Sequence, residues 1–373
     1  MRVGIVGGGQ LGRMLALAGY PLGIRCITLD PAEDSPASHV APSIVGGYDD
    51  REALARLADG ADVITYEFEN VPVEAVRFLR ELAPVFPPPA ALEAAQDRAT
   101  EKSLFDELGV PTSPYEAIAT PVALRDGLAR LGAPAVLKTR RLGYDGKGQA
   151  VIHEPLLAED AWRAIGELPS ILEGFVAYDR ELSILGVRDR DGSTAFYPLI
   201  ENHHRDGILR LSIAPAPDLT LELQSMAETY GRLVMDRLEY VGVMAIELFQ
   251  VGEELVANEM APRVHNSGHW TIEGARTSQF ENHLRAITGL PLGSTAARGA
   301  NAMVNLIGVI PDAASMLVEQ GAHLHLYGKD PRPGRKVGHV TLNAEDGGSL
   351  DLRALGTEWP EILEVRYQGR PAG

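Results

Sequence analysis

The chain has 373 residues and a formal net charge of −17, from 34 Lys and Arg against 51 Asp and Glu. This length excludes a single small module and allows two or three domains, and 45% hydrophobic with 23% charged residues excludes a disordered or collagen-like chain. Because an acidic chain repels phosphate backbones and anionic lipid, we expect no nucleic acid and no membrane among its partners. Any phosphate site must therefore be a local basic island.

A single cysteine, Cys26, excludes an intramolecular disulfide and a multi-cysteine zinc site. It lies in the apolar run 24–29, so we expect a buried thiol that fills core volume. No uncharged apolar run reaches the roughly 18 residues that a membrane span needs. These features predict a cytoplasmic protein.

In the first ninety residues, short apolar runs alternate with helical patterns. The predicted elements, in chain order, are a strand at 3–6, a helix at 11–19, a strand at 24–30, a helix at 51–57 and a strand at 63–66. This βαβαβ order predicts a parallel sheet covered by helices. The prolines within 84–89 mark a domain boundary before a further helical segment, Ala90 to Leu108.

The glycine loop Gly7-Gly8-Gly9-Gln10-Leu11-Gly12 follows the first strand and opens the first helix, and Asp30 ends the next strand. This spacing matches a dinucleotide-binding loop, whose helix N-terminus offers N–H groups to an anion. Nothing in that physics requires nicotinamide. The loop would suit NAD or NADP, another phosphorylated or carboxylated small molecule, or a purely structural tight turn.

A second glycine loop follows the predicted strand Ala135–Lys138 and runs over 143–149. Four positive charges, those of Lys138, Arg140, Arg141 and Lys147, lie within the eleven residues 138–148. A flexible loop beside a fixed lysine can close over polyphosphate, although it is not a Walker A loop because no Ser or Thr follows Lys147. The alternative is a solvated hairpin tip.

Strands joined by polar turns follow, for example 182–187 and 194–198 around the turn 189–192, and they predict an antiparallel sheet. Farther on, the strands 243–249 and 255–260 form a predicted hairpin. If its turn is centred at residue 253, Glu247 lies directly opposite Glu259. Two facing carboxylates destabilise a hairpin unless a cation lies between them, so the pair predicts a magnesium site. The alternative is that both glutamates lie on an exposed face. A one-residue change of register would remove the match.

Two polar segments come next. The run 261–270 collects donors of several types, among them His265 and His269, and we expect it to form a ligand-binding loop that buries little. No third histidine or cysteine is near in sequence, which favours hydrogen bonding over metal ligation. After a linker at 290–299, the turn 329–336 carries four basic residues in eight, stiffened by prolines. It suits a phosphate monoester or is a surface loop selected for solubility.

The order of these features resembles the ATP-grasp superfamily. The stretches 9–14, 143–149, 258–270 and 332–339 are similar to the N5-carboxyaminoimidazole ribonucleotide synthase family, and the resemblance covers nearly the whole chain. It implies an α/β protein: an ATP-grasp fold with an N-terminal Rossmann-like (pre-ATP-grasp) parallel-sheet domain and a small C-terminal β-rich domain. The expected limits are 1–95, then 96–295 with a lid subdomain at about 112–178, then 296–373.

The reaction that this resemblance implies joins 5-aminoimidazole ribonucleotide, bicarbonate and ATP, through carboxyphosphate, to give N5-carboxyaminoimidazole ribonucleotide, ADP and phosphate in purine (IMP) biosynthesis. The implied cofactors are ATP and Mg²⁺, as one or two ions with Mn²⁺ as an alternative. A homodimer is also implied. The residues expected at ATP are Arg98, Lys138, Gly143, Tyr144, Asp145, Gly146, Lys147, Gly148, Gln149, Glu173, Gly174, Phe175, Val176, Glu181, His204, Asn258 and Glu259. Glu247 and Glu259 would hold the metal.

The resemblance also implies a site for the imidazole ribonucleotide. The residues expected there are Gln10, Leu11, Glu67, Arg263, His265, Asn266, Ser267, Lys329, Arg335 and Lys336, with Glu69 as a second candidate beside Glu67. Tyr144, Arg263, His265 and Lys336 would be catalytic. His265 would act either as a proton acceptor or as a hydrogen-bond donor to bicarbonate. The chain departs from the family pattern at 139–142, where relatives carry small polar residues and an extra glycine.

Three other functions remain open at this point. One is a different ATP-grasp ligase that acts on another phosphorylated amine. Another is an NAD-dependent oxidoreductase, which rests only on the first glycine loop and Asp30. The last is an ATP-binding regulator without catalysis.

Overall fold

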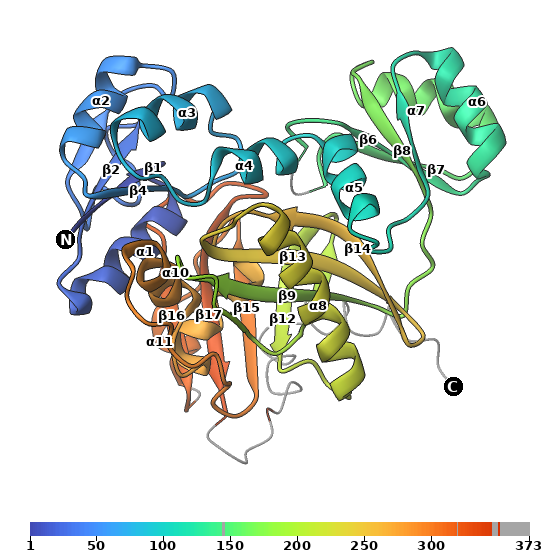
Figure 1. Ribbon diagram of the computed structural model, residues 1–373. Helices are drawn as coiled ribbons and strands as arrows, with labels where there is room; N and C mark the ends of the chain where they lie inside the picture. The colour runs from blue at the N-terminus through green and yellow to red at the C-terminus, as the bar shows by residue number, and fades with distance from the viewer. Residues whose placement is uncertain (144–145, 319, 345–349, 351–373) are drawn as a thin grey trace.

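Three β-sheets organise the part of the chain that the computed structural model describes, namely residues 1–143, 146–318, 320–344 and 350. In Figure 1 an N-terminal lobe and a smaller lid stand side by side above a larger body. The predicted α/β class, with a parallel N-terminal sheet and antiparallel sheets after it, is confirmed.

The N-terminal sheet is parallel and has the strand order β3-β2-β1-β4. Its strands and helices are β1 (Arg2–Val6), α1 (Gln10–Gly19), β2 (Arg25–Asp30), β3 (Ser43–Val45), α2 (Arg51–Asp59), β4 (Val63–Tyr66) and α3 (Val73–Leu82). All five predicted elements are present, and Cys26 is buried as expected. Of the four strands in this N-terminal sheet, only the short edge strand β3 was not predicted.

The helical segment predicted over 90–108 is in fact two helices, α4 (Pro89–Ala95) and α5 (Arg98–Glu107). The chain is extended at Asp97, whose carboxylate accepts the Ala99 N–H at 3.0 Å and so caps α5. The same carboxylate accepts two hydrogen bonds from Arg140, at 3.0 and 2.8 Å. Asp97, at the break between the two helices, therefore connects the start of α5 to the segment before the second glycine loop.

The lid is a four-stranded antiparallel sheet, of order β5-β8-β6-β7, with two helices packed on it. Its elements are β5 (Tyr115–Ile118), α6 (Pro121–Leu131), β6 (Ala135–Thr139), β7 (Gln149–Ile152), α7 (Ala158–Ala164) and β8 (Ser170–Gly174). The second glycine loop joins β6 to β7, because Lys138 pairs with Gln149. Lys138 thus stands at the base of the loop that the sequence predicts to cover phosphate.

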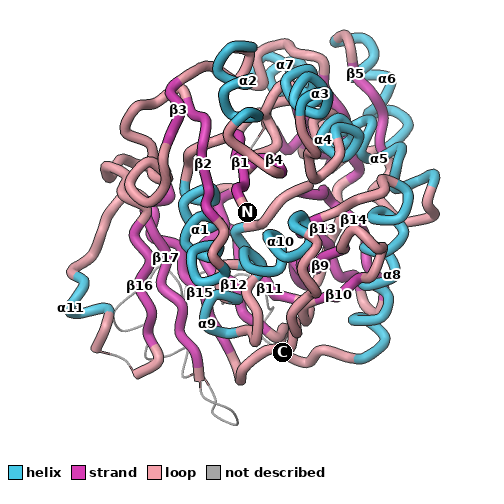
Figure 2. The backbone as a smooth tube through the Cα atoms, turned by 60° about the vertical axis from the view of Figure 1, so that its left-hand side comes forward, coloured by secondary structure: helices cyan, strands magenta, loops and turns pink. Residues whose placement is uncertain are grey.

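The body is built on a nine-stranded sheet of order β14-β13-β9-β11-β12-β15-β17-β16, with β10 on β9. Its elements are β9 (Arg180–Arg188), β10 (Thr194–Phe196), β11 (Ile200–Arg205), β12 (Ile208–Ala214), α8 (Leu221–Arg237), β13 (Gly242–Val251), β14 (Glu254–Ala261), α9 (Thr271–Gly274), α10 (Gln279–Thr288), β15 (Asn301–Ile307), α11 (Ala313–Met316), β16 (Ala322–Leu326) and β17 (Lys336–Asn343). Because β15 pairs with β12, the C-terminal strands continue this sheet, and Figure 2 shows β15 to β17 beside one another.

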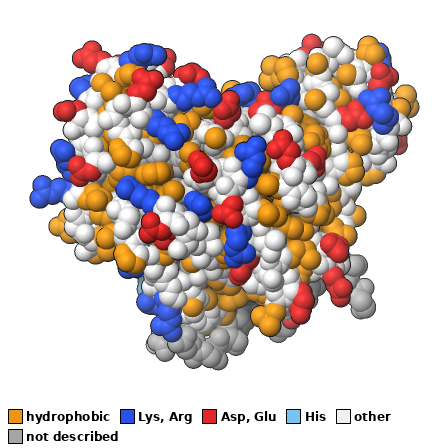
Figure 3. All heavy atoms as spheres, viewed as in Figure 1, with side chains coloured by type: hydrophobic (Ala, Val, Ile, Leu, Met, Phe, Trp, Pro, Cys, Tyr) orange, Lys and Arg blue, Asp and Glu red, His pale blue; other side chains and the backbone are white. Residues whose placement is uncertain are grey.

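Charged side chains of both signs share the face of the molecule seen in Figure 3. Lys, Arg, Asp and Glu side chains are intermingled on the face shown in Figure 3, with no single-sign region covering it. Among the described residues, no helix is both long and apolar enough to cross a membrane.

Candidate active site

The β13–β14 hairpin contains a β-bulge that decides which side chains meet. From the turn to Leu248↔Ala257 the paired residue numbers sum to 505, a register that would place Glu247 opposite Asn258. One extra residue, Asn258, then shifts the pairing, and Glu247 lies opposite Glu259. The predicted glutamate pair is confirmed, but the predicted turn centre at residue 253 is wrong by half a residue. The bulge restores the match.

The bulge also explains how one strand serves the core and the site together. Ala257 and Met260 are both buried in the core cluster beneath the hairpin, although strict alternation would turn Met260 away from it. The extra residue resets the alternation, so that Asn258 and Glu259 stay outside that core. Asn258 then reaches Lys138 of the lid, whose ammonium donates to Asn258 Oδ1 at 3.2 Å.

Helix α5 holds the bulge from its outer side. Glu101 Oε1 accepts the N–H of Met260 at 2.6 Å, and Lys102 Nζ donates to the carbonyl of Ala257 at 3.2 Å. These two backbone groups belong to the residues immediately before and after Asn258 and Glu259. Both side chains are almost fully buried, at 2% and 1% exposure. Consecutive residues of one helix therefore satisfy the open edge of β14 where it carries Asn258 and Glu259.

The two facing glutamates have opposite electrostatic surroundings. Arg98 donates to Glu259 at 2.7 Å. Burial opposes ionisation of Glu259, but the Arg98 guanidinium outweighs it and holds the pKa of Glu259 below its ordinary value. For Glu247, burial and the charge of Glu259 both raise the pKa. One carboxylate is compensated by the protein, and the other remains without an equal counter-charge.

A lysine pair converges on one carboxylate behind these residues. Glu173 Oε2 lies 3.0 Å from Lys138 Nζ and 3.6 Å from Lys102 Nζ. Burial would raise the pKa of Glu173, but the two ammonium groups outweigh it and lower that pKa. The second oxygen of Glu173 is buried and has no hydrogen-bond partner among the described residues. An acceptor is thus left for a ligand at the junction of lid and body.

Two further predicted residues form an ion pair in the body. His204 Nδ1 lies 2.6 Å from Glu181 Oε2, and Tyr178 donates to the other Glu181 oxygen at 2.7 Å. Burial would lower the pKa of His204, but the Glu181 carboxylate outweighs it and raises that pKa. The charge of Glu247 acts on His204 as well, so the pair belongs to the same site.

The first glycine loop is occupied by a side chain of the protein itself. The N–H of Gly9 donates to Glu67 Oε1 at 2.5 Å, and the N–H of Gly12 donates to Glu67 Oε2 at 2.6 Å. A Cβ at Gly7 or Gly9 would lie 2.4 or 2.5 Å from Glu67, so the glycines make room for this carboxylate. The helix N-terminus does bind an anion, as its physics predicts, but that anion is Glu67.

Glu69, the alternative to Glu67, pairs with Arg263 instead. Burial would raise the pKa of Glu69, but the Arg263 guanidinium lowers it, and the charge of Glu259 also acts on Glu69. Arg263 thereby links the N-terminal lobe to the residues that follow β14. The two candidates have different partners: Glu67 holds the glycine loop and Glu69 holds Arg263.

His265 lies beside the glutamate pair. Its Nε2 is 3.5 Å from Glu247 Oε1. Burial and the neighbouring charge of Arg263 lower the pKa of His265 to about 3, and the charge of Lys336 acts in the same direction. The imidazole is therefore neutral at physiological pH.

The turn 329–336, called the basic turn from here on, lies on the other side of the site. Lys329 donates to Gln10 Oε1, and burial lowers the pKa of Lys329 to about 8. Arg335 donates to the carbonyl of Asp330 at 3.1 Å. The charge of Lys336 acts on Glu247 and His265, which places the start of β17 at the site. The turn and the first glycine loop, far apart in sequence, thus meet.

The polar run 261–270 was expected to bury little, and that expectation is wrong. Ser267, His269 and Trp270 are each at most 1% exposed. Asn266 exchanges two hydrogen bonds with Asn305, at 3.0 and 2.7 Å. Such internal hydrogen bonds let a hydrophilic segment be buried, although the buried Trp270 Nε1 has no partner among the described residues. Near His269, the described residues contain no group of three side chains able to hold a metal ion.

Tyr144 and Asp145 lie outside the described residues. Of the other predicted loop residues, Gly146 and Gly148 have φ of 75° and 72°, which glycine adopts without strain. Phe175 is 49% exposed in the segment that leads from the lid to β9. Leu11 is buried on α1 among core residues.

Three residues that hold the site together were not predicted from the sequence: Glu101, Lys102 and Gln279. Gln279 N–H₂ and its amide oxygen bond both backbone groups of His265, at 2.7 and 2.8 Å. The only sequence signal is the helical spacing of Arg98, Glu101 and Lys102, three and four residues apart, which places them on one face of α5. Nothing in the sequence marks Gln279.

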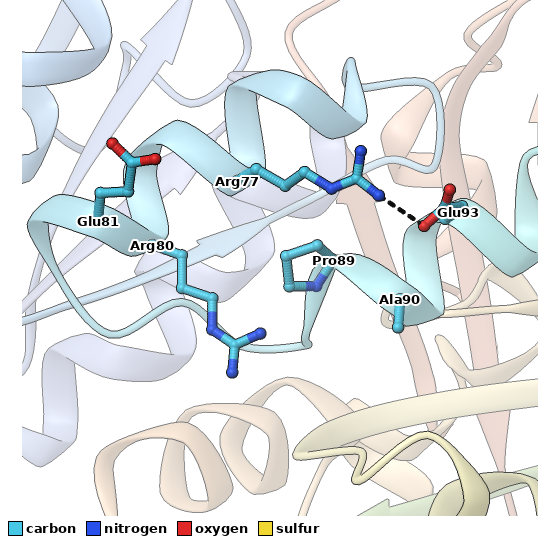
Figure 4. A pocket seen from close by; sticks show the side chains of 6 residues that line it. All are labelled: Arg77, Arg80, Glu81, Pro89, Ala90 and Glu93. Atoms are coloured by element: carbon cyan, nitrogen blue, oxygen red, sulfur yellow. Dashed lines mark hydrogen bonds and ion pairs between the residues drawn. The ribbon is translucent and has the colours of Figure 1, made fainter.

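A separate groove of about 350 Å³ lies between α3 and α4, lined by Arg77, Arg80, Glu81, Pro89, Ala90 and Glu93. Figure 4 shows Arg77 bonded to Glu93, at 2.8 Å. None of the residues predicted for the site lines this groove.

Family models match the chain in three segments. A ribonucleotide synthetase preATP-grasp domain matches residues 1–96, an ATP-grasp domain matches 103–280, and a phosphoribosylaminoimidazole carboxylase C-terminal domain matches 301–353. The N5-carboxyaminoimidazole ribonucleotide synthase of Pseudomonas aeruginosa is 52% identical, over 96% of this chain and 99% of that protein. The chain belongs to the N5-carboxyaminoimidazole ribonucleotide synthase family. This family is one of ATP-grasp ligases.

Solved structures of members of this family have the same fold as this chain. The N5-carboxyaminoimidazole ribonucleotide synthetase of Thermus thermophilus is 57% identical and superposes with a TM-score of 0.90, covering 97% of this chain and 98% of that one. The Aspergillus clavatus synthase, solved with ADP and 5-aminoimidazole ribonucleotide, is 31% identical with a TM-score of 0.89 and 98% coverage of both chains.

The unequal glutamates predict a pH dependence of stability. An acid whose pKa is raised on folding destabilises the fold as pH rises above its ordinary pKa. For Glu247 this destabilisation grows over the pH range from the ordinary pKa of 4.5 to the raised pKa of about 7. Without divalent cations, we expect Glu247→Gln to gain stability over wild type across this range, by at most about 3 kcal/mol, and to gain nothing further above it. Urea unfolding at several pH values measures this, with exposed Glu254→Gln as the matched control. A constant difference between variant and wild type would contradict the account.

The contact of α5 with the bulge predicts a second effect. Glu101→Met leaves the buried Met260 N–H without an acceptor, which costs about 1–3 kcal/mol, whereas Glu101→Gln keeps an acceptor. We expect the Met variant to lose this free energy of unfolding and to raise the KM for ATP, and the Gln variant to stay nearer wild type in both. Glu107→Met, exposed on the same helix, is the control. Equal losses in the Met and Gln variants would show that the hydrogen bond is not what matters.

Proposed function

We propose that this protein is an ATP-dependent ligase that joins bicarbonate to the exocyclic amine of 5-aminoimidazole ribonucleotide. The products are N5-carboxyaminoimidazole ribonucleotide, ADP and phosphate, and the reaction belongs to purine biosynthesis. The observation that carries the proposal is the glutamate pair Glu247 and Glu259, which is set beside Arg98, Lys138 and His265. The membership of the chain in this family supports the same reaction.

The glutamate pair fits magnesium. Carboxylate oxygens are the donors that Mg²⁺ prefers, and it is bound in ATP enzymes by one or two carboxylates together with phosphates and water. The raised pKa of Glu247 shows a carboxylate whose ionisation the protein alone does not compensate. When bound, the cation would neutralise phosphate charge during phosphoryl transfer. Glu247 and Glu259 would hold it; Mn²⁺ could replace it, and the number of ions is one or two.

The residues around the pair would bind the nucleotide. Lys138, in the strand below the second glycine loop, would place a fixed charge on the ATP phosphates, with Arg98 beside it. Glu181 would bind the ribose hydroxyls, and the segment 173–176 would line the adenine pocket. His204 and Asn258 would complete the nucleotide site. Glu173 offers an unused buried acceptor there.

The second glycine loop, residues 143–149, would cover the phosphates. Carboxyphosphate forms when bicarbonate attacks the γ-phosphorus, and it hydrolyses readily in water. Closure of the loop over the site would exclude water until the amine attacks the carboxyl carbon and phosphate leaves.

The ribonucleotide would lie between the N-terminal lobe and the basic turn. Lys329, Arg335 and Lys336 supply positive charge for its phosphate monoester. The first glycine loop does not take that phosphate, since Glu67 occupies its N–H groups. Gln10, already bonded to Lys329, is placed to contact the ligand from the same side. Tyr144, Arg263, His265 and Lys336 would surround bicarbonate and the amine.

The occupied glycine loop also argues against an NAD-dependent oxidoreductase. A pyrophosphate would need the N–H groups of Gly9 and Gly12, and the two Glu67 oxygens already accept them. We further propose a homodimer, which the family resemblance supports, and a cytoplasmic enzyme, because a lone buried cysteine suits a reducing compartment.

The proposed reaction predicts the fate of an isotope. With ¹⁸O-labelled bicarbonate, ATP and 5-aminoimidazole ribonucleotide, we expect one ¹⁸O atom in each phosphate released, because the attacking bicarbonate oxygen stays on phosphorus. Mass spectrometry of phosphate measures this, while product formation is followed in parallel.

Two controls make the result decisive. Unlabelled bicarbonate in ¹⁸O-water should leave phosphate unlabelled once bicarbonate exchange is corrected for, and Glu259→Gln should abolish turnover. ADP formation that needs neither bicarbonate nor the ribonucleotide would point to another ATP-grasp ligase, and nucleotide binding without turnover would point to a regulator.

A further inference from the structure

Behind His265, a chain of buried polar side chains runs into the central sheet. Its members are Ser267 after the bulged hairpin, Ser183 on β9, Asn202 on β11 and Ser212 on β12, and each is at most 4% exposed. Ser267 Oγ is 2.8 Å from His265 Nδ1 and 2.9 Å from Ser183 Oγ. Asn202 is 2.9 Å from Ser183 and 2.8 Å from Ser212. Polar groups in an otherwise apolar sheet centre are costly unless they are fully bonded.

A backbone N–H group fixes the donor-to-acceptor direction of these side-chain hydrogen bonds. The N–H of Ser267 points at His265 Nδ1 from 3.3 Å. A backbone N–H can only donate, so Nδ1 must present its lone pair. The Ser267 hydroxyl then donates to Nδ1, the Ser183 hydroxyl donates to Ser267, and the Asn202 amide donates to Ser183. Every donor points towards His265.

The backbone of His265 is held as firmly as its ring. Gln279, with no exposed surface, accepts the His265 N–H at 2.8 Å and donates to the His265 carbonyl at 2.7 Å. A Cβ at Gly268 would lie 2.7 Å from the same Gln279 oxygen, so the glycine permits this approach. The ring cannot turn over without breaking the bonds at Nδ1.

The opposite ring nitrogen faces the site. With Nδ1 accepting, the single proton of a neutral imidazole is on Nε2. Nε2 lies 3.5 Å from Glu247 Oε1, on the side of the glutamate pair. A protonated Nε2 donates a hydrogen bond and has no lone pair to take a proton.

We propose that Ser267, Ser183 and Asn202 are positioning residues that fix His265 as an Nε2–H donor to a small oxyanion, bicarbonate or its phosphorylated form. This proposal rests on the function proposed above and deepens it, because it decides between the two roles open to His265. His265 binds the oxyanion and is not the proton acceptor. Ser267, being fully buried, acts through His265 and does not contact the substrate.

Nitrogen NMR of the whole enzyme labelled with ¹⁵N-histidine tests the tautomer without any substrate. We expect His265 to show an unprotonated Nδ1 and a protonated Nε2, with its signals identified by their loss in His265→Gln. A protonated Nδ1, or signals averaged between tautomers, would overturn the proposal. Since no turnover is measured, this result is independent of whether the proposed reaction is correct.

A pair of variants tests the donor role. The Gln side-chain amide reaches the position of Nε2 and can donate there, whereas the Asn amide reaches only that of Nδ1. We expect His265→Gln to keep roughly a tenth of kcat and His265→Asn to lose roughly 100-fold or more, as when one donor to a developing oxyanion is removed, with the KM for ATP little changed in both. Equal losses in the two variants would overturn the donor role.

A second pair tests the chain behind the ring. Ser267→Ala should lower kcat several-fold and introduce the second tautomer in the NMR spectrum, with the free energy of unfolding measured alongside. Ser43→Ala, on the edge strand β3 of the N-terminal sheet, is the matched control and should change neither. If the spectrum and kcat of Ser267→Ala were identical to those of wild type, the row of buried polar side chains would not position His265.

Discussion

One extra residue in strand β14 determines the geometry of the site. The bulge at Asn258 places Glu259 opposite Glu247 and directs Asn258 to Lys138, while Ala257 and Met260 remain in the core. Two carboxylates facing each other in a buried hairpin are unfavourable. Arg98 compensates one of them, and we propose that a bound cation compensates the other. Helix α5, through Glu101 and Lys102, keeps the bulge in this shape.

Charged contacts also connect the three parts of the molecule at the site. Arg263 joins Glu69 of the N-terminal lobe to the body, Lys138 joins the lid to Asn258, and Lys329 of the basic turn joins Gln10. The overall charge of −17 is therefore compatible with anionic substrates, because Arg98, Lys138 and Lys329 lie where the lobes meet. Glu67 shows the opposite arrangement: an anion of the protein fills a loop that would otherwise attract phosphate.

The sequence predicts the parallel N-terminal sheet, the antiparallel sheets and the glutamate pair, because hydrophobic periodicity and turn residues act locally. The break between α4 and α5 was not predicted. Asp97 belongs to a residue type that favours helix N-caps, but the helical neighbours on both sides led to the prediction of one continuous segment. The position of Asn258 in a bulge was missed because a turn centre half a residue away gave the same pairing. The partners of Glu67, Glu69 and Gln279 are long-range contacts, which only the folded chain brings together.

We propose that the bulge makes Glu247 and Glu259 a joint cation site for ATP. A crystal of the protein with Mn²⁺ and a non-hydrolysable ATP analogue, measured at the manganese absorption edge, tests it most directly. We expect an anomalous peak between the two carboxylates, from a cation bonded to an oxygen of each and to phosphate oxygens, with Lys138 on the same phosphates. A nucleotide bound with its cation on neither glutamate, or on Glu259 alone with Glu247 turned away, would contradict it.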